Sequence, residues 1–101
     1  MSFIENLKIY YNETLNLNPQ LVESEIRVMD LFLLGKSNLE IAQFLYISPL
    51  TVKTHFLHVY QKFGLSGKTT VKRPTLAIAY LLWKENKEKE IAKISSGHPK
   101  I

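Results

Sequence analysis

The sequence predicts an all-α protein, and three features of its 101 residues support this class. Apolar residues recur at the three- and four-residue spacings of amphipathic helices in several segments. Helix start and stop signals, such as Ser48-Pro49 before one segment and Gly35 or Gly64 after others, separate these segments. No stretch alternates apolar and polar residues for long enough to predict a strand. We therefore expect five helices around one modest core.

The first predicted helix covers residues 3–15 and follows Ser2, a residue type favoured at the N-cap. Residues 16–19 then break it. The second predicted helix covers residues 23–34, begins with acidic residues that the helix dipole favours, and ends before Gly35. Its apolar positions cover most of its circumference, so we expect it at the centre of the core.

A third, short helix is predicted to begin after Ser37 or Asn38 and to end near Leu45. Asn38 followed by Glu40 resembles a start signal, but we do not identify the complete capping-box spacing. Residues 46–47 would then form a tight connection to the next helix.

The fourth predicted helix has the strongest start signal, with Ser48 as N-cap and Pro49 as its first residue, and it runs to Phe63. A basic loop follows, and a last helix is predicted from Thr75 to about Glu90. The expected organisation is a helical extension, a single domain and a disordered tail, over residues 1–18, 19–90 and 91–101.

The third and fourth predicted helices have the features of a helix-turn-helix. Steep crossing of two helices requires a small residue at the contact, and Ala42 meets this requirement. On the fourth helix, apolar side chains one turn apart form an inward stripe: Val52, Phe56, Val59 and Phe63. The opposite face has no acidic residue and consists of Leu50, Lys53, Thr54, Leu57, His58 and Gln61.

The charge pattern favours a polyanionic partner for this face. The net charge is +4, and no acidic residue occurs between Glu40 and Glu85. This interval contains the basic residues Lys53, Lys62, Lys68, Lys72 and Arg73, together with His55 and His58. Charge alone would also suit an ordinary solvated surface, but its location within a helix-turn-helix favours nucleic acid.

Positions on the fourth helix predict separate roles in DNA contact. Near its N-terminus, Lys53, Thr54 and Leu57 point furthest outward, where such helices enter the major groove. A lysine suits guanine O6 or N7, and apolar groups suit thymine methyls. We assign base contacts to these three residues and to His58.

Phosphate contacts are predicted for residues beside the inward stripe and in the basic loop. We assign them to Ser48, Thr51, His55, Gln61, Lys62, Lys68 and Lys72. His55 and His58 have no cysteine or nearby acid to complete a zinc site, so no metal is expected.

Two runs, Gly35-Lys-Ser-Asn-Leu-Glu-Ile-Ala42 and Ile47-Ser-x-x-Thr-Val-Lys-x-His55, resemble the LuxR/GerE-type DNA-binding domain of bacterial transcription regulators. The resemblance implies a four-helix helix-turn-helix domain, here with an extra N-terminal helix, that is dimeric on DNA. It also implies base contacts by Lys53, Thr54 and Leu57, and phosphate contacts near Ser48, Thr51 and Lys62. The loop departs from the family, because Arg73 fits the expected arginine only if extra residues are inserted around 67–71.

The last helix suggests self-association. Leu76, Tyr80 and Trp83 form one stripe, while other apolar residues lie on other sides, so more than one face needs cover. Either a second copy or the helix at residues 3–15 could provide it. We expect a homodimer with these three residues at its interface.

The predicted function is a sequence-specific double-stranded DNA-binding transcription regulator that acts as a homodimer. The alternative is an interaction module of the same fold that binds RNA polymerase or another regulator. The residues that would serve it are Leu50, Leu57 and Phe44, with Phe3, Tyr10 and Tyr11 near the N-terminus. An enzyme is not expected, because the sequence lacks cysteine, a glycine-rich phosphate loop and a paired acid and base. No cofactor, small-molecule ligand or membrane span is expected, and the predicted location is cytoplasmic.

Overall fold

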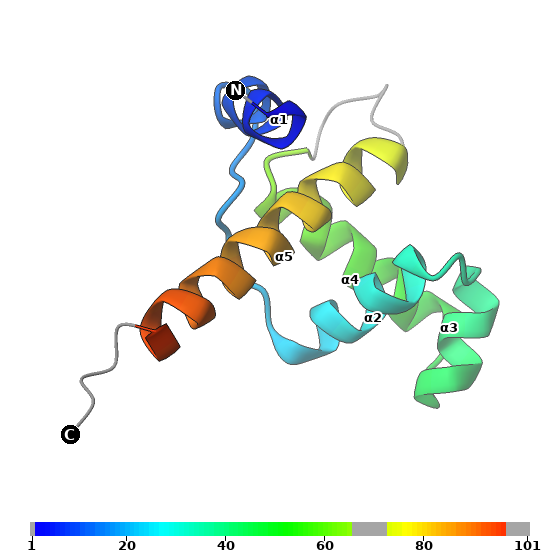
Figure 1. Cartoon of the computed structure of the whole chain (residues 1–101). Helices are drawn as coiled ribbons and strands as arrows, with labels where there is room; N and C mark the ends of the chain where they lie inside the picture. Colours follow the sequence, from blue (N-terminus) through cyan, green and yellow to red (C-terminus); the bar gives the residue numbers. More distant parts are fainter. Residues whose placement is uncertain (1, 66–72, 97–101) are drawn as a thin grey trace.

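The computed structural model describes residues 2–65 and 73–96, and it confirms the all-α class (Figure 1). Its helices are α1 (Phe3–Asn12), α2 (Glu23–Leu33), α3 (Asn38–Leu45), α4 (Pro49–Lys62) and α5 (Arg73–Ser96). No strand occurs within these described residues. Helices α2 to α5 enclose the core, whereas α1 lies outside this group and packs against α5.

The core forms where the inward stripe of α4 meets α2, α3 and α5. All four residues of that stripe are buried as predicted: Val52, Phe56, Val59 and Phe63. The other helices bury Val28, Met29, Leu31, Ile41, Ala42, Leu76, Ala79, Tyr80, Leu82 and Trp83 against it. Burial of a large apolar side chain contributes about 1.5–3 kcal/mol, so this shared core positions α4 firmly.

Local signals set most helix boundaries. Ser2 caps α1 by accepting a hydrogen bond from the Glu5 N–H, and Gly35 and Gly64 adopt positive φ angles of 84° and 80° where α2 and α4 stop. At α2 the N-cap residue Val22 has no capping side chain, and the Glu25 carboxylate accepts from the Val22 N–H at 2.9 Å, which is the other half of a capping box.

The expectation of an incomplete capping box at α3 was wrong. The N-cap is Ser37, whose hydroxyl oxygen accepts from the Glu40 N–H at 3.2 Å. The Glu40 carboxylate accepts from the Ser37 N–H at 3.0 Å, so both halves of the box are present. The three-residue spacing of the box runs from Ser37 to Glu40, so it is absent when Asn38 is taken as the N-cap.

Two other boundaries differ from the prediction. Helix α1 ends at Asn12 rather than near Leu15, because the next residues form a turn in which the Thr14 and Leu15 N–H groups both donate to the Tyr11 carbonyl. Helix α5 continues to Ser96, so the segment from Ile91 to Ser96 is helical rather than disordered. Residues 97–101 of the predicted tail lie outside the described residues.

The turn between α3 and α4 is tight, as expected. Ala42 is buried at the crossing of the two helices, and its carbonyl accepts from the Ile47 N–H at 3.0 Å. Tyr46 reverses the chain in the left-handed conformation, with φ 57° and ψ 42°, and its side chain is 95% exposed. This turn presents the N-terminus of α4 at the surface.

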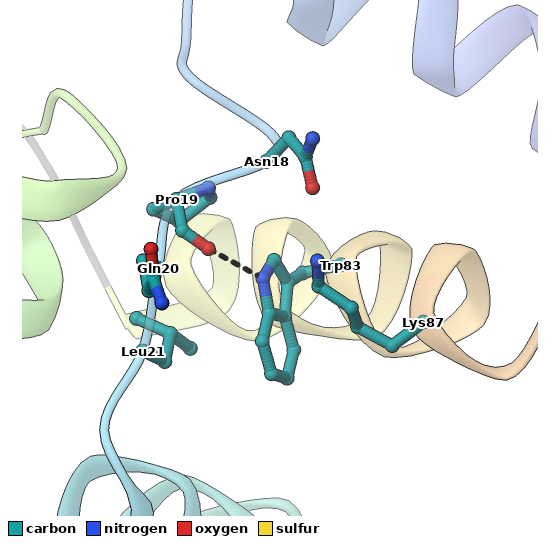
Figure 2. Close-up of a pocket in the computed structure, with 6 residues that line it drawn as sticks. All are labelled: Asn18, Pro19, Gln20, Leu21, Trp83 and Lys87. Atoms are coloured by element: carbon teal, nitrogen blue, oxygen red, sulfur yellow. Dashed lines mark hydrogen bonds between the residues drawn. The ribbon is translucent and has the colours of Figure 1, made fainter. Parts of the chain in front are cut away.

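The segment between α1 and α2 forms hydrogen bonds with both α4 and α5. The Asn16 backbone N–H and side-chain amide donate to the carbonyls of Phe63 and Lys62, at 3.1 Å and 3.2 Å. Further along, the Trp83 indole Nε1 donates to the Pro19 carbonyl at 2.8 Å, and Figure 2 shows this bond. The segment therefore satisfies carbonyls at the end of α4 and covers one side of α5.

Candidate nucleic-acid interface

Helix α4 presents an uncovered face opposite its core stripe. Lys53, Thr54, Leu57, His58 and Gln61 are exposed there, as is Leu50. The Thr54 hydroxyl donates to the Leu50 carbonyl at 3.1 Å, which fixes the position of the hydroxyl group. The face contains no acidic residue, so nothing on α4 itself would repel phosphate.

The start of α4 is rigidly capped. The Ser48 hydroxyl oxygen accepts from the Thr51 N–H at 3.0 Å, and the two hydroxyl groups lie 2.9 Å apart. Ser48 is exposed and Thr51 is half-buried, beside His55 on the same side of the helix. These three predicted phosphate-contacting residues therefore lie together, although their role in binding stays a prediction.

Lys62 has a different environment from the other predicted phosphate contacts. Its Nζ lies 2.6 Å from a carboxylate oxygen of Glu25, a residue that is only 3% exposed. Burial, the largest influence, would raise the pKa of Glu25. The hydrogen bonds from Lys62 and the Val22 N–H, with the charges of Lys62 and His58, outweigh it and lower this pKa below its ordinary value. The charge of Lys62 is thus compensated within the chain.

The residues assigned to a dimer interface lie inside the protein. Leu76 and Tyr80 are fully buried, and Trp83 is 6% exposed. The Tyr80 hydroxyl donates to an Asp30 carboxylate oxygen at 2.5 Å, and Trp83 bonds to Pro19 as described above. Because α2 and the segment at residues 16–22 already cover this stripe, the reason for placing it at a dimer interface no longer holds.

Two further predicted phosphate contacts lie in the basic loop. Lys68 and Lys72 lie outside the described residues, so their predicted phosphate contacts stay predictions.

Sequence reasoning missed the environment of Arg73, the first residue of α5. Its guanidinium carbon lies 4.3 Å from the centroid of the Phe56 ring and 5.6 Å from that of Phe32. Its Nη2 donates to the Asn38 side-chain oxygen at 2.9 Å. The signal available in the sequence was its position directly before Pro74 at a helix start, but stacking on α4 could not be foreseen.

Other candidate sites are weaker. A surface hollow of about 400 Å³ lies between residues 18–21 and α5, beside Trp83 and Lys87 (Figure 2). Across residues 2–65 and 73–96, no three potential ligands cluster in a way that would hold a metal ion. No helix in that part of the chain has the length and apolarity needed to cross a membrane.

Comparisons with known proteins agree with this geometry. Residues 19–73 match the family model described as bacterial regulatory proteins of the luxR family, GerE type. This match covers more than half of the 101 residues, and the chain belongs to that family. The sequence-based family prediction is confirmed.

Similar proteins occur in mycobacteria. One protein from Mycobacterium bovis and two from Mycobacterium tuberculosis, all named as proposed HTH-type transcriptional regulators, are 46% identical to this chain over 48 residues. The shared segment is 48% of this chain but only 5% of each relative's length. No solved structure matches the chain.

Proposed function

We propose that this protein is a transcription regulator that binds double-stranded DNA in a sequence-specific way through α4. The observation that carries the proposal is the uncovered face of α4, which is free of acids and combines Lys53 with the apolar groups of Thr54 and Leu57. A purely electrostatic binder would need only cations there. Apolar groups beside a lysine suit the mixed hydrogen-bonding and methyl pattern of the major groove.

In this proposal α4 enters the major groove with residues 50–58 of its uncovered face. Lys53, Thr54, Leu57 and His58 contact base edges, because all four are exposed on the outward side. Ser48, Thr51, His55 and Gln61 contact phosphates. Lys62 contributes less to binding than expected from sequence, because its ion pair with Glu25 already compensates its charge.

We also propose a homodimer, with a revised interface. On α5, Leu81 is 52% exposed and turned away from the core, and the half-buried Ala77 lies next to it, one turn earlier. This side replaces the buried stripe as the contact between two copies. Sedimentation of Leu81→Lys should give monomers, whereas Ile91→Lys, further along the same helix, should sediment like the wild type.

A second candidate function is protein interaction through the α2–α3 surface. Phe44 is 68% exposed beside a hollow of about 350 Å³ that Leu31 and Leu45 also line. RNA polymerase or another regulator is the proposed partner class. Phe44→Ser should then abolish transcriptional activation and leave DNA binding unchanged.

The experiment that tests the main proposal is a salt series. Fluorescence anisotropy with a labelled duplex, selected by the protein from a random-sequence pool, should give affinity that falls steeply with salt. Each phosphate neutralised by a basic side chain contributes about −0.9 to the log–log slope, so binding through about five basic groups should give a slope of about −4 to −5. Absent or salt-insensitive binding would contradict the proposal. If the protein bound the selected duplex no more tightly than random DNA, the sequence-specific part of the proposal would be contradicted.

A further inference from the structure

Arg73 is held in one place although it lies at the surface. The Phe56 ring is under its guanidinium at 4.3 Å and the Phe32 ring is next to it at 5.6 Å, both within the range of a cation–π attraction. The hydrogen bond to Asn38 fixes the rotation of the guanidinium plane. Three elements, α2, α3 and α4, therefore position one cation of α5.

Several other surface cations are compensated by an ion pair, whereas Arg73 has none among the described residues. Arg27 pairs with Glu23, Lys62 with Glu25 and Lys84 with Asp30. Among the residues that the structure describes, no carboxylate forms an ion pair with Arg73, whose only hydrogen-bond acceptor is a neutral amide oxygen. A guanidinium has five N–H donors, so donors remain for a ligand.

The position of Arg73 relative to α4 indicates which ligand this is. Phe56 lies at the edge of the buried stripe of α4 and borders the flank that carries Lys53 and Tyr60, which are three and four residues away from it. Burial raises the pKa of Tyr60 and the nearby charge of Arg73 opposes this, which agrees with Arg73 lying on that flank. The proposed phosphate contacts Thr51 and His55 lie on the other flank.

We infer that Arg73 contacts a DNA phosphate on the Lys53 flank of α4, opposite the phosphate contacts of Thr51. A helix in the major groove lies between two phosphate backbones, and contacts on both fix its orientation. The planar fork of arginine suits phosphate oxygens, and stacking on Phe56 arranges it before binding. The inference rests on the proposed DNA binding by α4, and it adds a positioning contact outside that helix.

The test compares Arg73→Gln with the wild type on the selected duplex and on random duplex DNA. Loss of one phosphate contact per subunit should weaken both complexes by about tenfold for each bound subunit and reduce the magnitude of the salt slope by about 0.9 per subunit, or about 1.8 for the proposed homodimer. Arg73→Lys keeps the charge and should retain most of the slope. Arg27→Gln, an exposed arginine of α2 that pairs with Glu23, is the matched control and should leave the slope unchanged.

A second measurement places the contact on the DNA. Neutral methylphosphonate groups are introduced one at a time into the selected duplex. At one phosphate of each half-site, neutralisation should weaken wild-type binding but not binding by Arg73→Gln, because the arginine partner is already absent.

The outcomes separate the inference from the proposed function. A folded Arg73→Gln variant that keeps the wild-type salt slope overturns the contact and leaves DNA binding by α4 intact. The same applies if the variant binds more weakly with an unchanged slope and a lower unfolding temperature, because Arg73 is then structural only. If the wild-type protein binds no DNA, the proposed function is overturned, and the Arg73 contact is overturned as well.

Discussion

Helices α4 and α5 both carry apolar stripes, but the chain covers them differently. Helix α4 buries one stripe and leaves outside an acid-free face that mixes polar and apolar side chains. Over residues 76–83, α5 is apolar nearly all round, and its stripe of Leu76, Tyr80 and Trp83 packs against α2 and the segment at residues 16–22 of the same chain. Apolar content thus predicts that a face will be covered, but not what covers it. The composition of the face left uncovered is the better guide to a partner.

The largest effect that tests this comparison is expected from Trp83→Ala. Because Trp83 is buried against Pro19 and Leu21, its truncation should lower the free energy of unfolding by about 3–5 kcal/mol in urea denaturation. Leu81→Ala, on the uncovered side of the same helix, should cost less than about 1 kcal/mol. If Trp83→Ala instead kept its stability and lost self-association, Trp83 would face a second copy of the chain. The Trp83 side of α5 would then be the uncovered one.

A smaller stability effect is expected where α4 is joined to α2. Glu25→Gln removes the ion pair with Lys62 and weakens the cap of α2, and it should cost about 1–3 kcal/mol at neutral pH. The cost stays below that of a fully buried pair because Lys62 is partly exposed.

This effect should depend on pH with a definite sign. Because the pKa of Glu25 is lower in the folded than in the unfolded state, its contribution is fully present above the unfolded pKa of about 4.3. It is lost as the pH falls through the folded pKa. The difference in unfolding free energy between wild type and Glu25→Gln should therefore shrink below about pH 4. A difference that stays constant down to pH 2 would show that the charge of Glu25 contributes nothing.

On the uncovered face of α4, Lys53→Ala should change binding without changing stability. The exposed lysine should account for about 1–3 kcal/mol of discrimination between the selected duplex and random DNA. Anisotropy titrations on both duplexes measure this difference. If Lys53→Ala lost the same affinity for both duplexes, Lys53 would contact a phosphate, and other residues would contact the bases.

The smallest effect is expected at the turn, and it is a gain. Tyr46→Gly should raise the free energy of unfolding by about 0.5–1 kcal/mol, because glycine adopts a positive φ angle without the cost that a side chain has there. The ring of Tyr46 buries almost nothing, so little is lost with it. Tyr46→Ala keeps the strain and serves as control. Equal stability of the two variants would show that the left-handed conformation is not the cause.

The sequence predicted α4 almost completely because its signals are local. Ser48, Pro49 and Gly64 bound the helix, and the inward and outward faces follow from its periodicity alone. The family was also recognisable from two short runs, and the match over residues 19–73 confirms it.

What could not be predicted depends on contacts between distant residues. Trp83 bonds to Pro19 across 64 positions, and Arg73 stacks on a phenylalanine of α4 and bonds to an asparagine of α3. Neither pairing has a spacing rule, because the tertiary fold alone brings these residues together. For the same reason, the sequence predicted that Lys62 lies beside the uncovered face of α4 but not that it pairs with Glu25.

The hydrogen bonds of Asn16 have a consequence for how the molecule opens. Because this residue bonds to the last carbonyls of α4, residues 16–17 and the end of α4 should open together, as one cooperative unit. Helix α1 has no buried residue and should open independently and far more often. Native-state hydrogen exchange should therefore show fast-exchanging amides in α1 and, only a few residues after it, an Asn16 amide that is protected as strongly as the amides at the end of α4.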